Sequence, residues 1–139
     1  KKYGPTLTIS GDDLRNILNY KKFSRKERLN YALTYGKLCK KILENKINVI
    51  LSTVSLFHKV RRWNKLNIKN YIEIYIESDL KKIIKQKKKF FYKGNHKNIV
   101  GKNLKAELPL VPNIIIKNDF KKSINSLSNE LLTKINKII

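Results

Sequence analysis

The sequence has a single cysteine, few acidic residues and no long apolar run, and each shortage excludes a class of protein. Cys39 has no second cysteine with which to form an internal disulfide, which favours a reducing compartment such as the cytoplasm. No apolar stretch approaches the length of a membrane span, and none is typical of a secretory signal. His58 and His96 lie far from any cysteine or histidine partner, so we predict no metal site.

Acidic residues are outnumbered by basic ones. The chain has 10 Asp and Glu against 32 Lys and Arg, a formal charge of +22. Such an excess is typical of proteins that bind polyanions. However, most of the cations are lysines scattered along every segment, and the joint richness in Lys, Asn and Ile is typical of a biased nucleotide composition. We therefore expect an anionic small ligand, no specific nucleic acid and no membrane, with a basic nucleic-acid-binding module as the alternative.

The order of the expected elements predicts an α/β fold. Short apolar runs predict four buried strands, and helical spacing or capping residues predict the helices between them. The strands are Leu7–Ile9, Ile47–Leu51, Tyr71–Ile76 and Ile114–Ile116, and the helices are Asp12–Leu18, Ser24 (capped with Glu27) to Asn45, Ser55–Leu66, Ser78 or Asp79 to Lys85, and Phe120–Ile138. This alternation indicates a single domain with a mostly parallel sheet and helices on both faces.

Two polar turns follow expected strands. Gly11-Asp12-Asp13-Leu14-Arg15 sets a carboxylate and a cation at the carboxyl end of a strand, where open α/β sheets bind ligands. A carboxylate that takes a proton from a hydroxyl, beside an arginine that holds a phosphate, is the equipment of a small-molecule kinase. The structural alternative is a helix start that favours acids. Ser52-Thr53-Val54-Ser55 is a second candidate segment, with a helix N-cap as its alternative.

Two further features lie in a long connection over residues 87–112. Loops of this length in a compact domain are often functional lids. The run Lys87-Lys88-Lys89 belongs either to such a lid or to a solvated face. The segment Lys97-Asn98-Ile99-Val100-Gly101 is either a site loop or a solvated turn.

Six short motifs follow one another along nearly the whole chain. They are Ser10–Arg15, Phe23-Ser24, Ser52–Ser55, Ile72–Tyr75, Lys97–Gly101 and Pro109–Pro112. In this order they resemble the adenylylsulfate kinases, which phosphorylate a nucleotide 3′-hydroxyl. The resemblance implies a three-layer P-loop NTPase fold, ATP and Mg²⁺ as cofactors, and a nucleotide as acceptor. A homodimer is compatible with it, although the sequence does not report the oligomeric state.

The resemblance also implies roles for individual residues. Asp12 would be the base on the 3′-hydroxyl, Arg15 would hold substrate phosphate oxygens, and Arg28 is a second candidate anion holder. The lid residues near the ATP phosphates would be Lys87, Lys88 and Lys89, and the acceptor site would be lined by Ser52, Thr53, Ser55, Lys97, Asn98 and Ile99.

Two departures from the family pattern affect the expected acceptor. Where typical members place two phenylalanines around adenine, this chain has Thr53 and Ile99. Stacking on an aromatic face contributes about 1–3 kcal/mol per base, so losing both rings weakens adenine binding. The segment from Ser55 to Tyr71 resembles a divergent branch found with surface-polysaccharide genes, which includes cytidine diphosphoramidate kinase. We therefore expect cytidine diphosphoramidate, used in capsule biosynthesis, as acceptor, and adenylylsulfate of sulfate assimilation as the alternative.

The motif Gly-x-x-x-x-Gly-Lys-Ser/Thr, which cradles ATP phosphates, does not occur in the 139 residues. Family members carry it on a central strand that precedes the Ser10–Arg15 turn. The chain begins at Lys1 without an initiator methionine. The expectation is therefore a kinase domain over residues 1–139 that lacks this strand and its loop, with strand pairing interrupted in the middle of the sheet.

Overall fold

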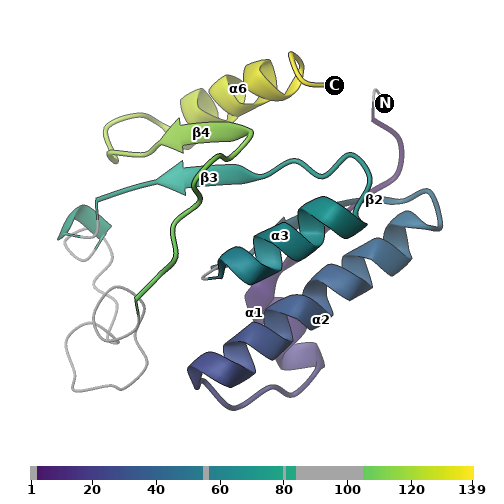
Figure 1. Cartoon of the computed structure of the whole chain (residues 1–139). Helices are drawn as coiled ribbons and strands as arrows, with labels where there is room; N and C mark the ends of the chain where they lie inside the picture. The colour runs from purple at the N-terminus through teal and green to yellow at the C-terminus, as the bar shows by residue number, and fades with distance from the viewer. Residues whose placement is uncertain (1–2, 55–56, 80, 84–104) are drawn as a thin grey trace. The chain divides into compact units, whose positions relative to one another are not determined.

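The computed structural model describes residues 3–54, 57–79, 81–83 and 105–139, which divide into two compact units (Figure 1). The first unit comprises Lys1–Tyr71 with Leu104–Leu108. The second comprises Ile72–Asn103 with Pro109–Ile139. We describe each unit by itself. No helix among the described residues is long and apolar enough to cross a membrane.

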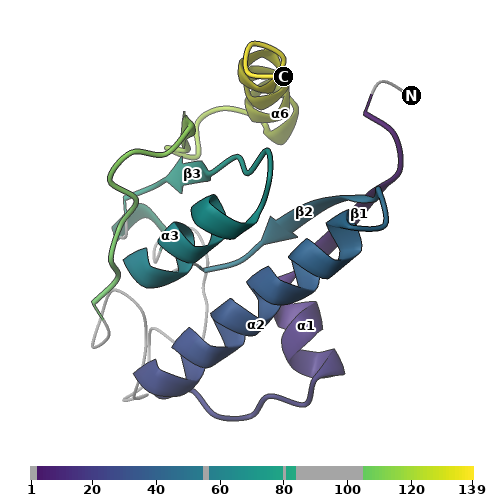
Figure 2. The same ribbon diagram turned by 45° about the vertical axis from the view of Figure 1, so that its right-hand side comes forward.

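The first unit is built on two parallel strands, β1 (Thr6–Ser10) and β2 (Asn48–Ser52). Helix α1 (Gly11–Ile17) follows β1 without a loop, and α2 (Arg25–Leu43) makes the connection to β2. Helix α3 (His58–Asn67) follows β2 and packs on α2, which in turn lies along β2 (Figure 2). Parallel pairing requires a crossover of this kind, and it brings the carboxyl ends of both strands to one edge.

Two helix starts are fixed by capping boxes. In α2, the Ser24 hydroxyl accepts a hydrogen bond from the Glu27 backbone N–H at 3.3 Å, and the Glu27 carboxylate accepts one from the Ser24 N–H at 3.3 Å. Ser10 and Asp13 make the same exchange at the start of α1. Each box satisfies N–H groups that have no partner within the helix. The capping box predicted at Ser24 is therefore confirmed.

The core of the first unit lies between α1, α2 and α3. Its buried apolar residues are Leu14, Tyr35, Cys39, Phe57 and Val60. Cys39 is a free thiol, and burial raises its pKa, as expected of a packed cysteine. Helix α2 approaches α3 closely at Gly36, where an added Cβ would lie 2.5 Å from Asn64 Oδ1.

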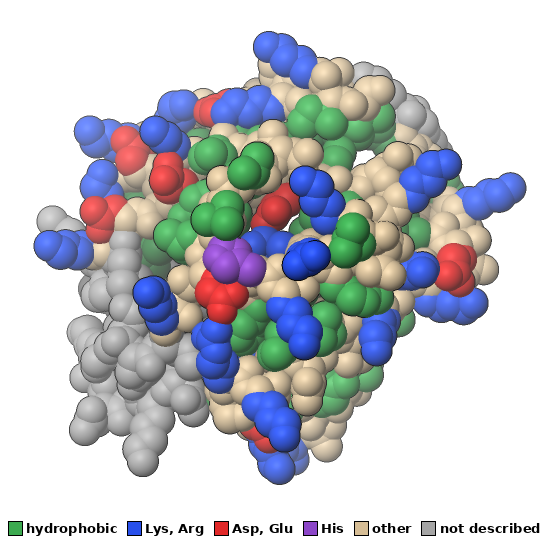
Figure 3. Space-filling model, viewed as in Figure 1, with side chains coloured by type: hydrophobic (Ala, Val, Ile, Leu, Met, Phe, Trp, Pro, Cys, Tyr) green, Lys and Arg blue, Asp and Glu red, His purple; other side chains and the backbone are tan. Residues whose placement is uncertain are grey.

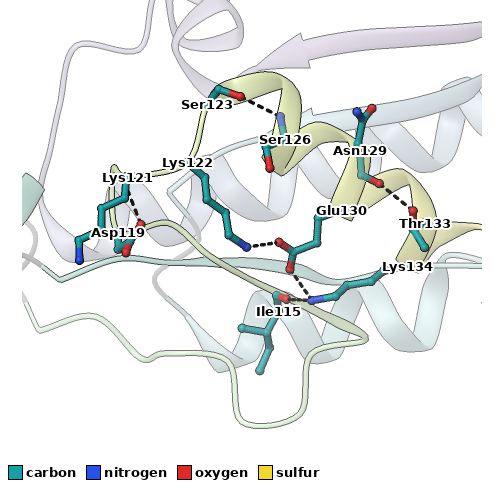
Figure 4. A network of polar contacts seen from close by, with 10 residues as sticks. All are labelled: Ile115, Asp119, Lys121, Lys122, Ser123, Ser126, Asn129, Glu130, Thr133 and Lys134. Atoms are coloured by element: carbon teal, nitrogen blue, oxygen red, sulfur yellow. Dashed lines mark hydrogen bonds and ion pairs between the residues drawn. The ribbon is translucent and has the colours of Figure 1, made fainter.

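The second unit pairs β3 (Ile74–Glu77) in parallel with β4 (Ile114–Lys117) and continues into α6 (Ile124–Ile135). Ile114 and Ile116 are buried at 3% and 2% exposure. Helix α6 is attached to β4 by Lys134, whose Nζ donates to the Ile115 carbonyl oxygen at 2.7 Å (Figure 4). Glu130 bonds to Lys134 and also to Lys122, each at 2.9 Å.

The strands are less buried than the sequence predicts. All four exist and pair in parallel, but Ile50 of β2 is 57% exposed and Ile76 of β3 is 52% exposed. Among the described residues, hydrogen bonds pair β1 only with β2 and β3 only with β4. An apolar run predicts where a strand lies, but the burial of the strand depends on which elements cover each face of the sheet.

Several predicted boundaries were wrong. Helix α3 begins at His58 and not at Ser55, because its N-cap Phe57 has extended backbone angles. Helix α6 begins at Ile124 and not at Phe120, since Phe120 adopts a positive φ of 65° in a turn whose N–H groups bond to the side chains of Asn118 and Asp119. Strand β3 begins at Ile74, three residues later than predicted.

Candidate active site

The carboxyl ends of β1 and β2 bring two predicted segments together. Ser10 and Ser52 are register partners, so the turn after β1 lies beside the turn after β2. Gly11 and Thr53 are in close contact, because a Cβ added to Gly11 would lie 2.8 Å from Thr53 Oγ1. The Thr53 side chain therefore packs against the backbone that leads into Asp12. The alternative role of residues 52–55 as a helix N-cap is wrong, since α3 has no side-chain cap on its N-cap residue.

The two adjacent aspartates in this turn have different partners. Asp13 completes the capping box with Ser10, and the hydrogen bond from the Ser10 hydroxyl lowers the pKa of Asp13. The Asp12 side chain is 86% exposed and takes no part in the capping box. One of its oxygens lies 3.2 Å from Nη1 of Arg15. Asp12 is thus the carboxylate that remains accessible to a ligand.

Two arginines share one aromatic ring beside this turn. The guanidinium carbons of Arg15 and Arg28 lie 5.1 and 5.4 Å from the centre of the Phe23 ring. Burial, and next the nearby charge of Arg15, lower the pKa of Arg28. Two guanidinium groups this close repel each other, and an anion between them would relieve that repulsion. The structure therefore brings the two predicted anion holders together.

A cluster of tyrosines that sequence reasoning missed supports the same turn. Tyr20 stacks on Tyr31 with ring centroids 3.9 Å apart, and Tyr35 follows at 6.4 Å from Tyr20. Tyr35 is 4% exposed, its hydroxyl reaches the Gly11 carbonyl oxygen at 3.5 Å, and burial raises its pKa. The spacing of Tyr31 and Tyr35 on one helix face was the available signal.

Several predicted residues lie outside the described part of the chain, namely Ser55, Lys87, Lys88, Lys89, Lys97, Asn98 and Ile99. Within the described part, no group of His, Cys, Asp and Glu side chains could hold a metal ion. The motif that cradles ATP phosphates does not occur in the 139 residues. Lys and Arg side chains are spread across the face shown in Figure 3, with acidic side chains among them.

Known proteins resemble this chain in sequence and in fold. The sequence profile of the adenylylsulphate kinase family matches residues 1–117. The cytidine diphosphoramidate kinase of Campylobacter jejuni is 32% identical over 137 residues, which cover 94% of this chain and 81% of that protein. The adenylyl-sulfate kinase of Pseudomonas aeruginosa is 28% identical over 118 residues, covering 80% of this chain and 60% of that protein.

The fold has solved counterparts. The adenylylsulfate kinase CysC of Mycobacterium tuberculosis, solved in complex with AMPPNP and APS, superposes with a TM-score of 0.80. The match covers 97% of this chain and 82% of that structure at 17% sequence identity. The α/β arrangement with parallel strands is therefore that of the P-loop NTPase fold, as the sequence predicted.

Proposed function

The chain belongs to the adenylylsulfate kinase family, and on that premise we propose that it transfers a phosphoryl group from ATP to the ribose 3′-hydroxyl of a nucleotide, with cytidine diphosphoramidate as the acceptor. In the transfer, the 3′-oxygen forms a bond to the γ-phosphorus of ATP while the bond between that phosphorus and the β,γ-bridging oxygen breaks. The products are the 3′-phosphorylated nucleotide and ADP.

The observation that carries this proposal is the separation of roles between the two aspartates. Asp13 is held in a capping box, so its carboxylate serves the helix. Asp12 is exposed at the carboxyl end of β1, within reach of Arg15 and next to the Gly11–Thr53 contact. A carboxylate so placed can accept the hydroxyl proton while the arginines hold acceptor phosphate oxygens.

The residues of this chain supply the acceptor half of such a site. Positioning and charge neutralisation account for most of the catalysis in phosphoryl transfer. Arg15 and Arg28 provide positive charge beside one ring, and Asp12 orients the hydroxyl.

Two observations favour a cytidine acceptor. Thr53 stands beside Gly11, where a small polar side chain cannot provide the stacking surface that adenine uses. The similarity to cytidine diphosphoramidate kinase also extends over more of this chain than the similarity to adenylyl-sulfate kinase does. The alternative acceptor is adenylylsulfate.

A comparison of acceptors tests the proposal. We would measure kcat/KM of the full-length protein for cytidine diphosphoramidate and for adenylylsulfate, at fixed saturating ATP and Mg²⁺. The expected result is a preference for the cytidine nucleotide. A preference for adenylylsulfate would make that nucleotide the assigned acceptor. If the protein phosphorylates neither nucleotide, the kinase proposal is overturned.

A further inference from the structure

Glu107 joins the starts of two helices, although it is far from both in sequence. One oxygen of its carboxylate accepts a hydrogen bond from the backbone N–H of His58 at 2.6 Å, and the other is paired with Arg25. His58 is the first residue of α3, and Arg25 is the first residue of α2. Glu107 thus makes a direct link between the two helix starts.

The link replaces a cap that α3 lacks. The N-cap residue Phe57 makes no side-chain hydrogen bond to the helix, so the first N–H groups of α3 need another acceptor. A carboxylate at a helix N-terminus satisfies such a group and interacts favourably with the helix dipole. The hydrogen bond from the His58 N–H is the main cause that lowers the pKa of Glu107 below its usual value. The hydrogen bond and charge of Arg25 lower it further.

The backbone of Glu107 is held as well as its side chain. Arg61, the fourth residue of α3, is 7% exposed and donates to the Glu107 carbonyl oxygen. Arg61 also contacts Nδ1 of His58 at 2.9 Å. The Arg25 guanidinium lies 4.9 Å from the centre of the buried Phe57 ring. Glu107 is therefore held in the first unit through both its side chain and its main chain.

The two helix starts that Glu107 links lie close in the sequence to the candidate acceptor residues. Arg28 lies three residues after Arg25 on α2, and Ser52 and Thr53 lie at the carboxyl end of β2, the strand that precedes α3 in the chain. We propose that Glu107 is a positioning residue for the nucleotide acceptor, holding the Ser52–Thr53 turn and Arg28 in their relative places. This inference rests on the function proposed above.

Steady-state kinetics of Glu107 variants in the full-length protein test the inference. In Glu107→Ala, the KM for the nucleotide acceptor is expected to rise by about 10- to 100-fold, the range in which a misplaced binding group acts, while the KM for ATP stays unchanged. Glu107→Gln should be intermediate, because its amide oxygen can still accept the His58 hydrogen bond. Arg25→Gln should raise the acceptor KM in the same direction, since it removes the charged partner.

Glu44→Gln is the matched control. Glu44 forms a 2.9 Å ion pair with Lys41 at the other end of α2, so removing its charge should leave both KM values unchanged. If Glu107→Ala does not fold, the acceptor KM of Glu107→Gln and of Arg25→Gln still tests the inference. Unchanged acceptor KM in the folded variants, or a fall in kcat alone, would overturn the positioning role while leaving the kinase assignment intact. A wild-type protein without any nucleotide kinase activity would overturn both.

Discussion

Asp12 and Asp13 are neighbours in the sequence, yet their carboxylates have different partners. The Asp13 carboxylate accepts two hydrogen bonds from Ser10 at the helix start, whereas the Asp12 carboxylate pairs with Arg15 at 3.2 Å. The sequence shows the pair of acids, but it does not predict which one caps the helix and which one stays accessible. Both positions lie in the first turn of a helix, where acidic residues are favourable.

Asp12→Asn is expected to lower kcat by about 100- to 10,000-fold, the usual contribution of a positioned acid or base, and to change the acceptor KM little. The amide keeps the size of the side chain but cannot accept the hydroxyl proton. Turnover assays under saturating acceptor and ATP provide the measurement. Asp13→Asn offers the contrast, since it should reduce thermal stability by weakening the capping box. Wild-type turnover in Asp12→Asn would exclude Asp12 as the base.

The positions of helices and strands could be predicted from the sequence better than their ends and their burial. The capping box of α2 could be predicted because its partners are three residues apart. The acceptor at the start of α3 could not, because Glu107 is 49 residues from His58. The strands could be located by their apolar runs, but the exposure of Ile50 depends on which face another element covers. Local patterns therefore predicted the elements, and long-range contacts decided their ends and environments.

Gly36→Ala is expected to destabilise the contact between α2 and α3. The new Cβ would lie 2.5 Å from Asn64 Oδ1 and 3.1 Å from the Trp63 ring, so both side chains would have to shift. Overpacking typically costs about 1–3 kcal/mol, against a gain of about 1 kcal/mol in helix propensity. Urea unfolding would measure the change in free energy.

Lys37→Ala is the control for that substitution, since Lys37 is exposed at the next position of α2. It should change the free energy of unfolding by no more than about 0.5 kcal/mol. A Gly36→Ala protein more stable than wild type would mean that the two helices can separate without cost.

Charge dominates the behaviour of the whole molecule. With a formal charge of +22, the folded chain repels itself, and its few carboxylates offset that repulsion. Several of them are engaged by hydrogen-bond donors that lower their pKa, including Glu27 through Ser24, and Glu130 through Lys122 and Lys134. Because these values are lower in the folded chain, they contribute stability above the ordinary pKa of 4.5, which is lost as the pH falls below it.

Thermal stability is therefore expected to be nearly constant between about pH 6 and 8 and to fall below about pH 4.5. The decrease should be smaller at high salt, which screens the exposed charges. Melting temperatures recorded across this range at two salt concentrations would test it. Glu130→Gln should show a smaller decrease than wild type, because it has no carboxylate to protonate at that position. A melting temperature that rises on acidification would contradict the expectation.

Lys134 has a consequence for how this chain meets other chains. The N–H of Ile114 donates to the Glu73 carbonyl oxygen on the β3 side, so the Ile115 carbonyl, one residue on, faces the opposite edge of β4. That carbonyl already accepts from the Lys134 ammonium group. A strand arriving from another molecule would meet an occupied acceptor and a positive charge. The Lys134 bond thus occupies one acceptor at this edge of β4, and a lysine at a sheet edge disfavours pairing with a strand of another chain.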